Sequence, residues 1–281
     1  MTVANNLKTA VLLGGLGGLC VLIGSMWGGA GAFVGLLVGL AMTGGSYWFS
    51  DRLAIRSARA VEVTAQQMPQ YHAIVAELCQ RAELPMPRLY VSPEQQPNAF
   101  ATGRNPANAA VCVTEGLLHT MDWRQIQGVL AHEVSHVQHR DILIGSVAAA
   151  IAMGITFVAS IARWAMIFGG GRSDDRENPF VGFLMLMLAP IAAALIQAAI
   201  SRSREFEADA QAARLLGDGE PLAEALQTLE LGARAIPSHV NPAEASSYII
   251  NPLSGRSMSN LFSTHPSTEE RIARLRSRDW A

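Results

Sequence analysis

Charged residues are scarce in this sequence, and three long stretches have none. Of 281 residues only 16% are charged, against about 25% in an average soluble protein. Residues 9–50, 142–162 and 178–201 contain no Asp, Glu, Lys or Arg. Because a bilayer core needs about 20 apolar residues per helix, these stretches predict four membrane-spanning helices, two of them in the first stretch.

Two other interpretations of these stretches are weaker. Buried helices of a soluble protein rarely continue so far without a charge. The first stretch could contain a cleaved signal peptide, but Lys8 is the only basic residue before it and the apolar run is too long. We therefore expect an uncleaved pair of helices, in which Gly31, Gly35 and Gly39, spaced four apart, allow close packing.

Cysteine is also rare, and the net charge is close to zero. The three cysteines, Cys20, Cys79 and Cys112, form no C-x-x-C pair, which argues against a disulfide framework and a cysteine zinc knuckle. A net charge of −2 without a basic, aromatic-rich patch argues against nucleic acid as a partner. The lipid bilayer is the partner that the composition does predict.

The positions of the arginines divide and orient the chain. Arginines follow the second and fourth predicted spans, whereas the loop between the first two spans has neither Lys nor Arg. Since Lys and Arg collect on the cytoplasmic side, we expect membrane helices at residues 1–50 and 142–201. Residues 51–141 and 202–281 are then two cytoplasmic segments of one catalytic domain.

The cytoplasmic segments predict a mainly α fold with a small β-sheet. Helices are expected over residues 70–82, from 122 through the histidines toward 141, and over 267–276. Asp122 with Gln125, and Ser267 with Glu270, resemble the capping boxes that begin helices. Residues 88–91 and 110–114 predict strands, and residues 93–108, rich in Pro, Asn and Gly, predict a loop.

The strongest chemical signal is His132-Glu133-Val134-Ser135-His136 on a predicted helix. Histidines four apart share one helical face and can hold one Zn²⁺, while the adjacent glutamate can reach a water at the ion. The pattern alone also fits two surface histidines. His139 is the rival ligand, but it lies about 10 Å along the helix axis from His132, too far to share one ion.

A catalytic zinc needs a third protein ligand, and residues 201–209 contain the best candidates. Glu205 and Asp209 share a helical face, so the first could bind zinc while the second orients a histidine. Glu207 falls on another face. Such charged runs are usually solvated, but the predicted spans bring this segment and the histidines to the same membrane surface.

In order and spacing, these motifs resemble those of the HtpX-like membrane zinc metalloproteases, relatives of the eukaryotic CAAX prenyl endoproteases. The resemblance covers most of the chain. It also includes three further motifs, Pro85-Met86-Pro87-Arg88, Asn98-Ala99-Phe100-Ala101-Thr102-Gly103 and Thr264-His265-Pro266, together with Asp141 after the histidines.

The resemblance implies one zinc per subunit, held by His132, His136 and Glu205, with Glu133 as the catalytic carboxylate. It implies that Asp209 supports the ligands, and it suggests that two further residues, Asn98 and His265, face the cleft. It also implies an enzyme of the bacterial inner membrane whose active site faces the cytoplasm. Its substrates would be misfolded or damaged membrane proteins, cleaved under stress.

Metal-assisted peptide hydrolysis is the predicted reaction, with Glu133 as the general base. His265 is the candidate donor to the oxyanion, with Arg202 and Arg204 as alternatives. Residues 110–114 are expected to accept an extended substrate as an added strand.

Two other functions remain open at this point. A membrane scaffold or transporter with a structural zinc is the alternative from another class, but such a site has no need of Glu133. A prenyl-peptide protease would need more than four spans. The sequence predicts no oligomeric state.

Overall fold

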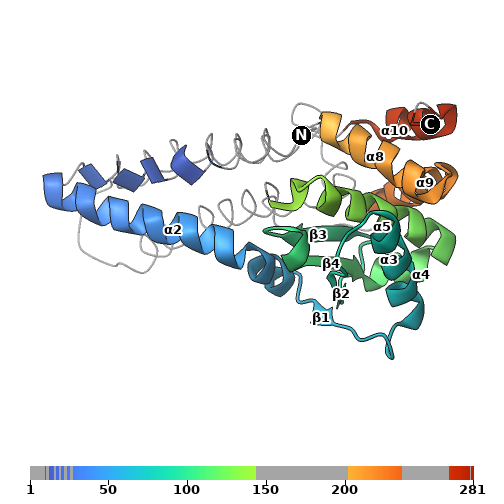
Figure 1. The fold of residues 1–281 in the computed structure, drawn as a ribbon, viewed down its shortest axis with the longest axis horizontal. Helices are drawn as coiled ribbons and strands as arrows, with labels where there is room; N and C mark the ends of the chain where they lie inside the picture. The colour runs from blue at the N-terminus through green and yellow to red at the C-terminus, as the bar shows by residue number, and fades with distance from the viewer. Residues whose placement is uncertain are drawn as a thin grey trace, which may run out of the picture.

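A small β-sheet and the helices packed on it form a body from which one long helix, α2, projects (Figure 1). The computed structural model describes residues 28–143, 202–235, 266–278 and 280–281, with isolated positions between residues 10 and 25. His265, the fourth predicted span and nearly all of the third lie outside the described residues.

Helix α2 (Gly28–Ser57) corresponds to the second predicted span. Its segment Gly28–Phe49 has a mean hydropathy of 1.5. It is the one helix in the described part of the chain that is long and apolar enough to cross a membrane. Arg52 and Arg56 lie in the last turns of the same helix, beyond the apolar segment.

Glycines allow α2 to pack closely against the helical residues that precede it. A Cβ atom added to Gly35 would collide with the backbone of Cys20, and one added to Gly39 would lie 3.1 Å from the Cα atom of Gly17. A larger side chain at Gly35 would force the two segments apart. The close packing predicted for glycines at this spacing is thus confirmed at Gly35 and Gly39.

The sheet has four strands in the order β1-β2-β4-β3: β1 (Val61–Glu62), β2 (Arg88–Ser92), β4 (Ala109–Thr114) and β3 (Ala99–Gly103). Strand β4 pairs with β2 in parallel and with β3 in antiparallel register, and all six of its residues are buried. Our prediction that residues 110–114 accept a substrate strand is wrong, because both edges of β4 are already paired.

Strand β3 was missed, because Ala99–Gly103 falls within the predicted loop at residues 93–108. Its sequence of alanine, phenylalanine, threonine and glycine has few of the β-branched residues that mark strands. The pairing of Ala101 with Val111 of β4 creates it. This strand lies at the edge of the sheet and contacts α5.

Helix α5 (Trp123–Gln138) lies at the centre of the body and contacts α3 (Pro69–Arg81), β3, α8 (Arg202–Leu216) and α9 (Glu220–Ala235). Its residues Val129, Leu130 and Val134 are buried in the main core. At Gly128 an added Cβ would lie 2.5 Å from the backbone nitrogen of Leu222, so only glycine allows α9 to approach this closely. The helix that carries the histidines is therefore held rigidly.

The beginning of α5 agrees with the prediction, but its end does not. Asp122 and Gln125 form the predicted capping box. The helix does not continue to Asp141, because Arg140 adopts a left-handed conformation with φ of 59°. This turn ends α5 and folds Asp141 back toward His136. The described residues also form the helices α4 (Glu115–Thr120) and α10 (Thr268–Ser277) and the 3₁₀ turn η1 (Pro106–Asn108).

Candidate metal centre

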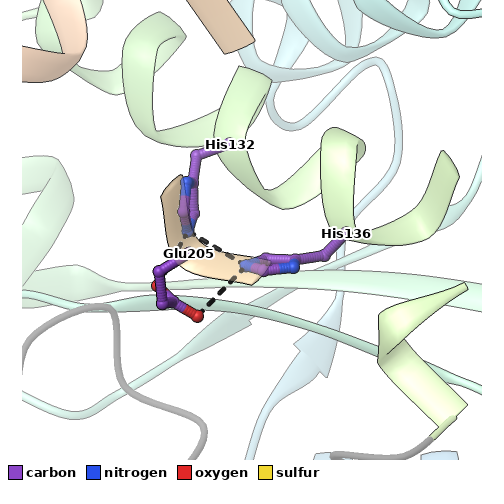
Figure 2. Close-up of side chains that lie close together, drawn as sticks. All are labelled: His132, His136 and Glu205. Carbon is purple, nitrogen blue, oxygen red and sulfur yellow. Dashed lines mark hydrogen bonds and ion pairs between the residues drawn. The ribbon is translucent and has the colours of Figure 1, made fainter. Parts of the chain in front are cut away.

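The two histidines of α5 and Glu205 of α8 point toward one another (Figure 2). The Nε2 atoms of His132 and His136 are 3.1 Å apart. The carboxylate oxygens of Glu205 lie 3.6 Å from the Nε2 atom of His132 and 3.7 Å from that of His136. Three potential ligand atoms thus lie within 4.8 Å of one another.

This group fits a zinc ion in both chemistry and spacing. Zinc takes nitrogen and carboxylate ligands at about 2.0–2.2 Å, so two ligand atoms of a tetrahedral site lie about 3.3 Å apart. The observed separations of 3.1, 3.6 and 3.7 Å lie close to that value. Three protein ligands leave the fourth position open, as a catalytic rather than a structural site requires.

Each histidine has a carboxylate behind it. The Nδ1 atom of His132 lies 2.9 Å from Asp209 of α8, and the Nδ1 atom of His136 lies 3.2 Å from Asp141. A carboxylate beside Nδ1 favours the imidazole tautomer that is protonated at Nδ1. The lone pair of Nε2 is then available to a metal ion. Asp209, which was predicted to orient a histidine, lies beside His132, whereas Asp141 was given no such role.

The two imidazoles differ in their electrostatics. Burial is the main effect on His132 and lowers its pKa. Burial would lower the pKa of His136 as well, but the carboxylates of Asp141, Glu205 and Glu133 together raise it to about 9. A metal ion that binds here therefore displaces a proton from His136, so metal affinity increases with pH.

Glu133 belongs to α5, and its buried side chain contacts β3. Burial, opposed in part by His136, raises the pKa of its carboxyl group to about 7, and the backbone of Ala101 in β3 forms a hydrogen bond with it. A carboxyl group that titrates near neutral pH can both accept and release a proton, which is the property required of a general acid–base catalyst.

A buried arginine completes the centre, and sequence analysis missed it. Arg271 of α10 is only 2% exposed and donates two hydrogen bonds to Asp209, of 2.7 and 2.8 Å. One of its nitrogens also lies 3.6 Å from Glu205. Burial would raise the pKa of Asp209, but the charge and hydrogen bonds of Arg271 hold it below its ordinary value. Asp209 therefore stays ionised beside His132.

The other candidate residues are only partly connected to this centre. Asn98 is buried directly before β3, and its backbone N–H donates to the hydroxyl of Thr114. Arg204 is buried, which lowers the pKa of its guanidinium, and the charges of Asp141 and Glu205 partly offset this effect. Arg202 is exposed. His139 caps the end of α5 and is not among the three groups that surround the potential ion.

Comparisons with known proteins agree with this chemistry. Peptidase family M48 matches residues 65–279. The chain is 49% identical over 276 residues to a protease HtpX homolog of Desulforapulum autotrophicum, covering 97% of this chain and 89% of the relative. It is 48% identical over 275 residues to a protease HtpX homolog of Pelotomaculum thermopropionicum, covering 96% of this chain and 98% of the relative.

The fold resembles that of a distant solved structure. The crystal structure of S. mikatae Ste24p matches with a TM-score of 0.51 at 18% identity and covers 97% of this chain. The chain spans 64% of the length of that protein, so this likeness concerns the fold alone.

The match to a peptidase family and the near-full-length protease relatives decide against one of the functions that the sequence left open. A membrane metalloprotease is confirmed over a scaffold or transporter, and the resemblance to HtpX-like proteases is confirmed as well. The family uses zinc, which the His-His-Glu group fits. This chain belongs to peptidase family M48.

Proposed function

We propose that this chain is a zinc-dependent endopeptidase of the bacterial inner membrane that cleaves misfolded or damaged membrane proteins at a site facing the cytoplasm. The observation that carries the proposal is the position of buried Glu133 beside the group formed by His132, His136 and Glu205. A structural zinc site would need no such carboxylate.

In this proposal each side chain of the centre has a role. His132, His136 and Glu205 hold the zinc, which supplies Lewis acidity that activates water near neutral pH. Asp209 and Asp141 fix the tautomer and the orientation of the two rings. Glu133 accepts a proton from the attacking water and returns it to the leaving amine.

The substrate is proposed to bind along the edge strand β3. The hydrogen bond between Ala101 and Glu133 brings this strand next to the catalytic carboxylate, so an extended peptide added to β3 would lie beside it. Asn98, at the start of β3, would face the same peptide. Backbone pairing selects unfolded chain rather than particular side chains, so a survey of cleavage sites should yield weak preferences. A single strict consensus would contradict this mode of binding.

His265 is the proposed hydrogen-bond donor to the oxyanion of the tetrahedral intermediate. It immediately precedes Pro266, which leads into α10, the helix whose Arg271 contacts the metal centre. His265→Ala should then lower kcat about 10²–10³-fold while zinc content and KM change little. Loss of zinc in this variant would instead indicate a structural role.

The proposed orientation rests on the arginines that follow the apolar part of α2. An epitope tag after Ala281 should be destroyed by protease in inverted membrane vesicles but should survive in intact spheroplasts. The opposite pattern would contradict a cytoplasmic active site.

The decisive experiment compares the unchanged protein with Glu133→Gln on an unfolded protein substrate in detergent. The substitution keeps both histidines, so zinc should remain bound while cleavage falls about 10²–10⁴-fold. Glu207→Gln, on α8 outside the ligand group, is the matched control and should cleave normally. Equal cleavage by Glu133→Gln, with zinc bound, would overturn the proposed mechanism.

A further inference from the structure

Three arginines from different parts of the chain converge on a cavity at the end of the apolar segment of α2. The cavity has a volume of about 430 Å³ and is lined by Arg52, Arg88 and Arg104, with Asp51 and two aromatic residues, Trp48 and Phe49. Ligand pockets commonly measure about 300–1,000 Å³.

The charge of the cavity favours an anion. Three arginines and one carboxylate give the described lining a formal charge of 3 − 1 = +2. Asp51 is already paired with Arg88 at 2.8 Å. Arg104 lies over the ring of Trp48, 4.6 Å from its centre, and donates one hydrogen bond to Asn108. Arg88 also donates to the hydroxyl of Tyr90. Each guanidinium has five N–H donors, so the contacts among the described residues use only part of this donor capacity.

The position of the cavity specifies the kind of anion. Trp48 and Phe49 are 55% and 50% exposed at the end of the apolar segment Gly28–Phe49. Tryptophan gathers where the hydrocarbon core meets the headgroups. With α2 inserted as proposed, the cavity would open at the depth of the lipid phosphates, with the apolar segment on the membrane side.

Orientation of the membrane helix does not account for all three arginines. Arg52 belongs to α2 and fits the excess of basic residues beside a span. Arg88 begins β2 and Arg104 directly follows β3, far along the chain from the span. The fold brings these two residues to the same cavity as Arg52.

We infer that this cavity binds the headgroup of an anionic phospholipid, with Arg52, Arg88 and Arg104 around the phosphate. The inference rests on the proposed insertion of α2 in the bilayer, but not on the peptidase activity. A lipid held here would link the end of the span to Arg104 and so to the edge strand β3, where the substrate is proposed to bind.

The test uses the full-length Glu133→Gln protein in a non-ionic detergent, since a protein without the catalytic base does not digest itself. Thermal unfolding is followed during titration with dioctanoyl phosphatidylglycerol, dioctanoyl phosphatidylcholine or inorganic phosphate. We expect stabilisation by phosphatidylglycerol, weakened as NaCl is raised from about 50 to 500 mM, and little effect of the other two. Arg88→Gln and Arg104→Gln should each weaken this binding about fivefold.

The control is Arg276→Gln. Arg276, like Arg88, has a half-exposed side chain paired with one carboxylate, but it lies on α10. Its substitution should leave lipid binding unchanged.

Equal binding of both lipids, absence of a salt effect, or an equal loss in Arg276→Gln would overturn the inference. Binding of inorganic phosphate as tight as that of the lipid would identify a soluble anion instead. The salt and lipid arms need no arginine variant, and the outcome of cleavage assays does not affect them.

Discussion

Two arginine–carboxylate pairs on the same helix have the same length but very different surroundings. On α10, Arg271 lies 2.7 Å from Asp209 and Arg276 lies 2.7 Å from Glu220. The side chain of Arg271 is 2% exposed, whereas that of Arg276 is 48% exposed. The distance alone therefore says little about what either pair contributes.

The surroundings of each ion pair decide how much it contributes to the stability of the protein. In water, the attraction of the Arg276 pair is screened and is opposed by the entropy of two ordered side chains. Inside the protein, removal of Arg271 would leave the Asp209 carboxylate buried without a counter-charge. Because Asp209 contacts the ligand His132, the buried pair links α10 to the metal centre, and the exposed pair does not.

The largest expected effect tests this difference directly. Arg271→Gln should lower the free energy of unfolding by about 3–5 kcal/mol, since it strands a buried carboxylate, and it should also weaken zinc binding. Arg276→Gln should produce no measurable change. Urea denaturation in detergent, with zinc quantified in the folded protein, checks both. If both variants lost the same stability, burial would not be the cause.

A smaller effect is expected from the carboxylates themselves. Asp209→Asn keeps the shape of the side chain but removes the charge that His132 and Arg271 face, so zinc affinity should fall about 10–100-fold. Asp141→Asn should lower the zinc affinity less, because the side chain of His136 is 17% exposed, against 1% for His132, so water can replace the lost carboxylate. Competition with a chromophoric chelator measures both affinities. An equal loss in the two variants would mean that burial of the histidine does not set the contribution of its carboxylate.

The sequence allowed the prediction of features that depend on local chemistry. Asp122 with Gln125 predicted the start of α5, and the spacing of His132 and His136 predicted their common face. The mainly helical fold with a small sheet is confirmed. Strand β3 and the end of α5 at Arg140 were missed, because one depends on pairing with β4 and the other on a left-handed residue that is not glycine.

Arg271 shows why part of the site could not be predicted. Helix α10 contains arginines at 271, 274 and 276, and composition does not distinguish them. The buried face of that helix includes Leu275, four residues after Arg271, so periodicity places Arg271 on the apolar side. Only the packing of α10 against α8 brings it to Asp209. Asp141 became a partner of His136 for a similar reason, through the turn at Arg140.

The smallest effect concerns a buried group to which the described residues supply no counter-charge. Burial raises the pKa of the Cys79 thiol on α3 to about 11, whereas the equally buried Asp209 beside Arg271 has its pKa lowered. At pH 8 the thiolate fraction of Cys79 should then be about 100-fold below that of a thiol with a pKa of 9. Alkylation by iodoacetamide, followed by mass spectrometry, should be slow and should keep accelerating up to about pH 11.

Restricted access alone would also slow the reaction, but the rate would then level off near pH 9, as it should for the same cysteine in urea. A plateau near pH 9 in the folded protein would therefore show that burial without a counter-charge does not control this group, and it would weaken the contrast with Asp209.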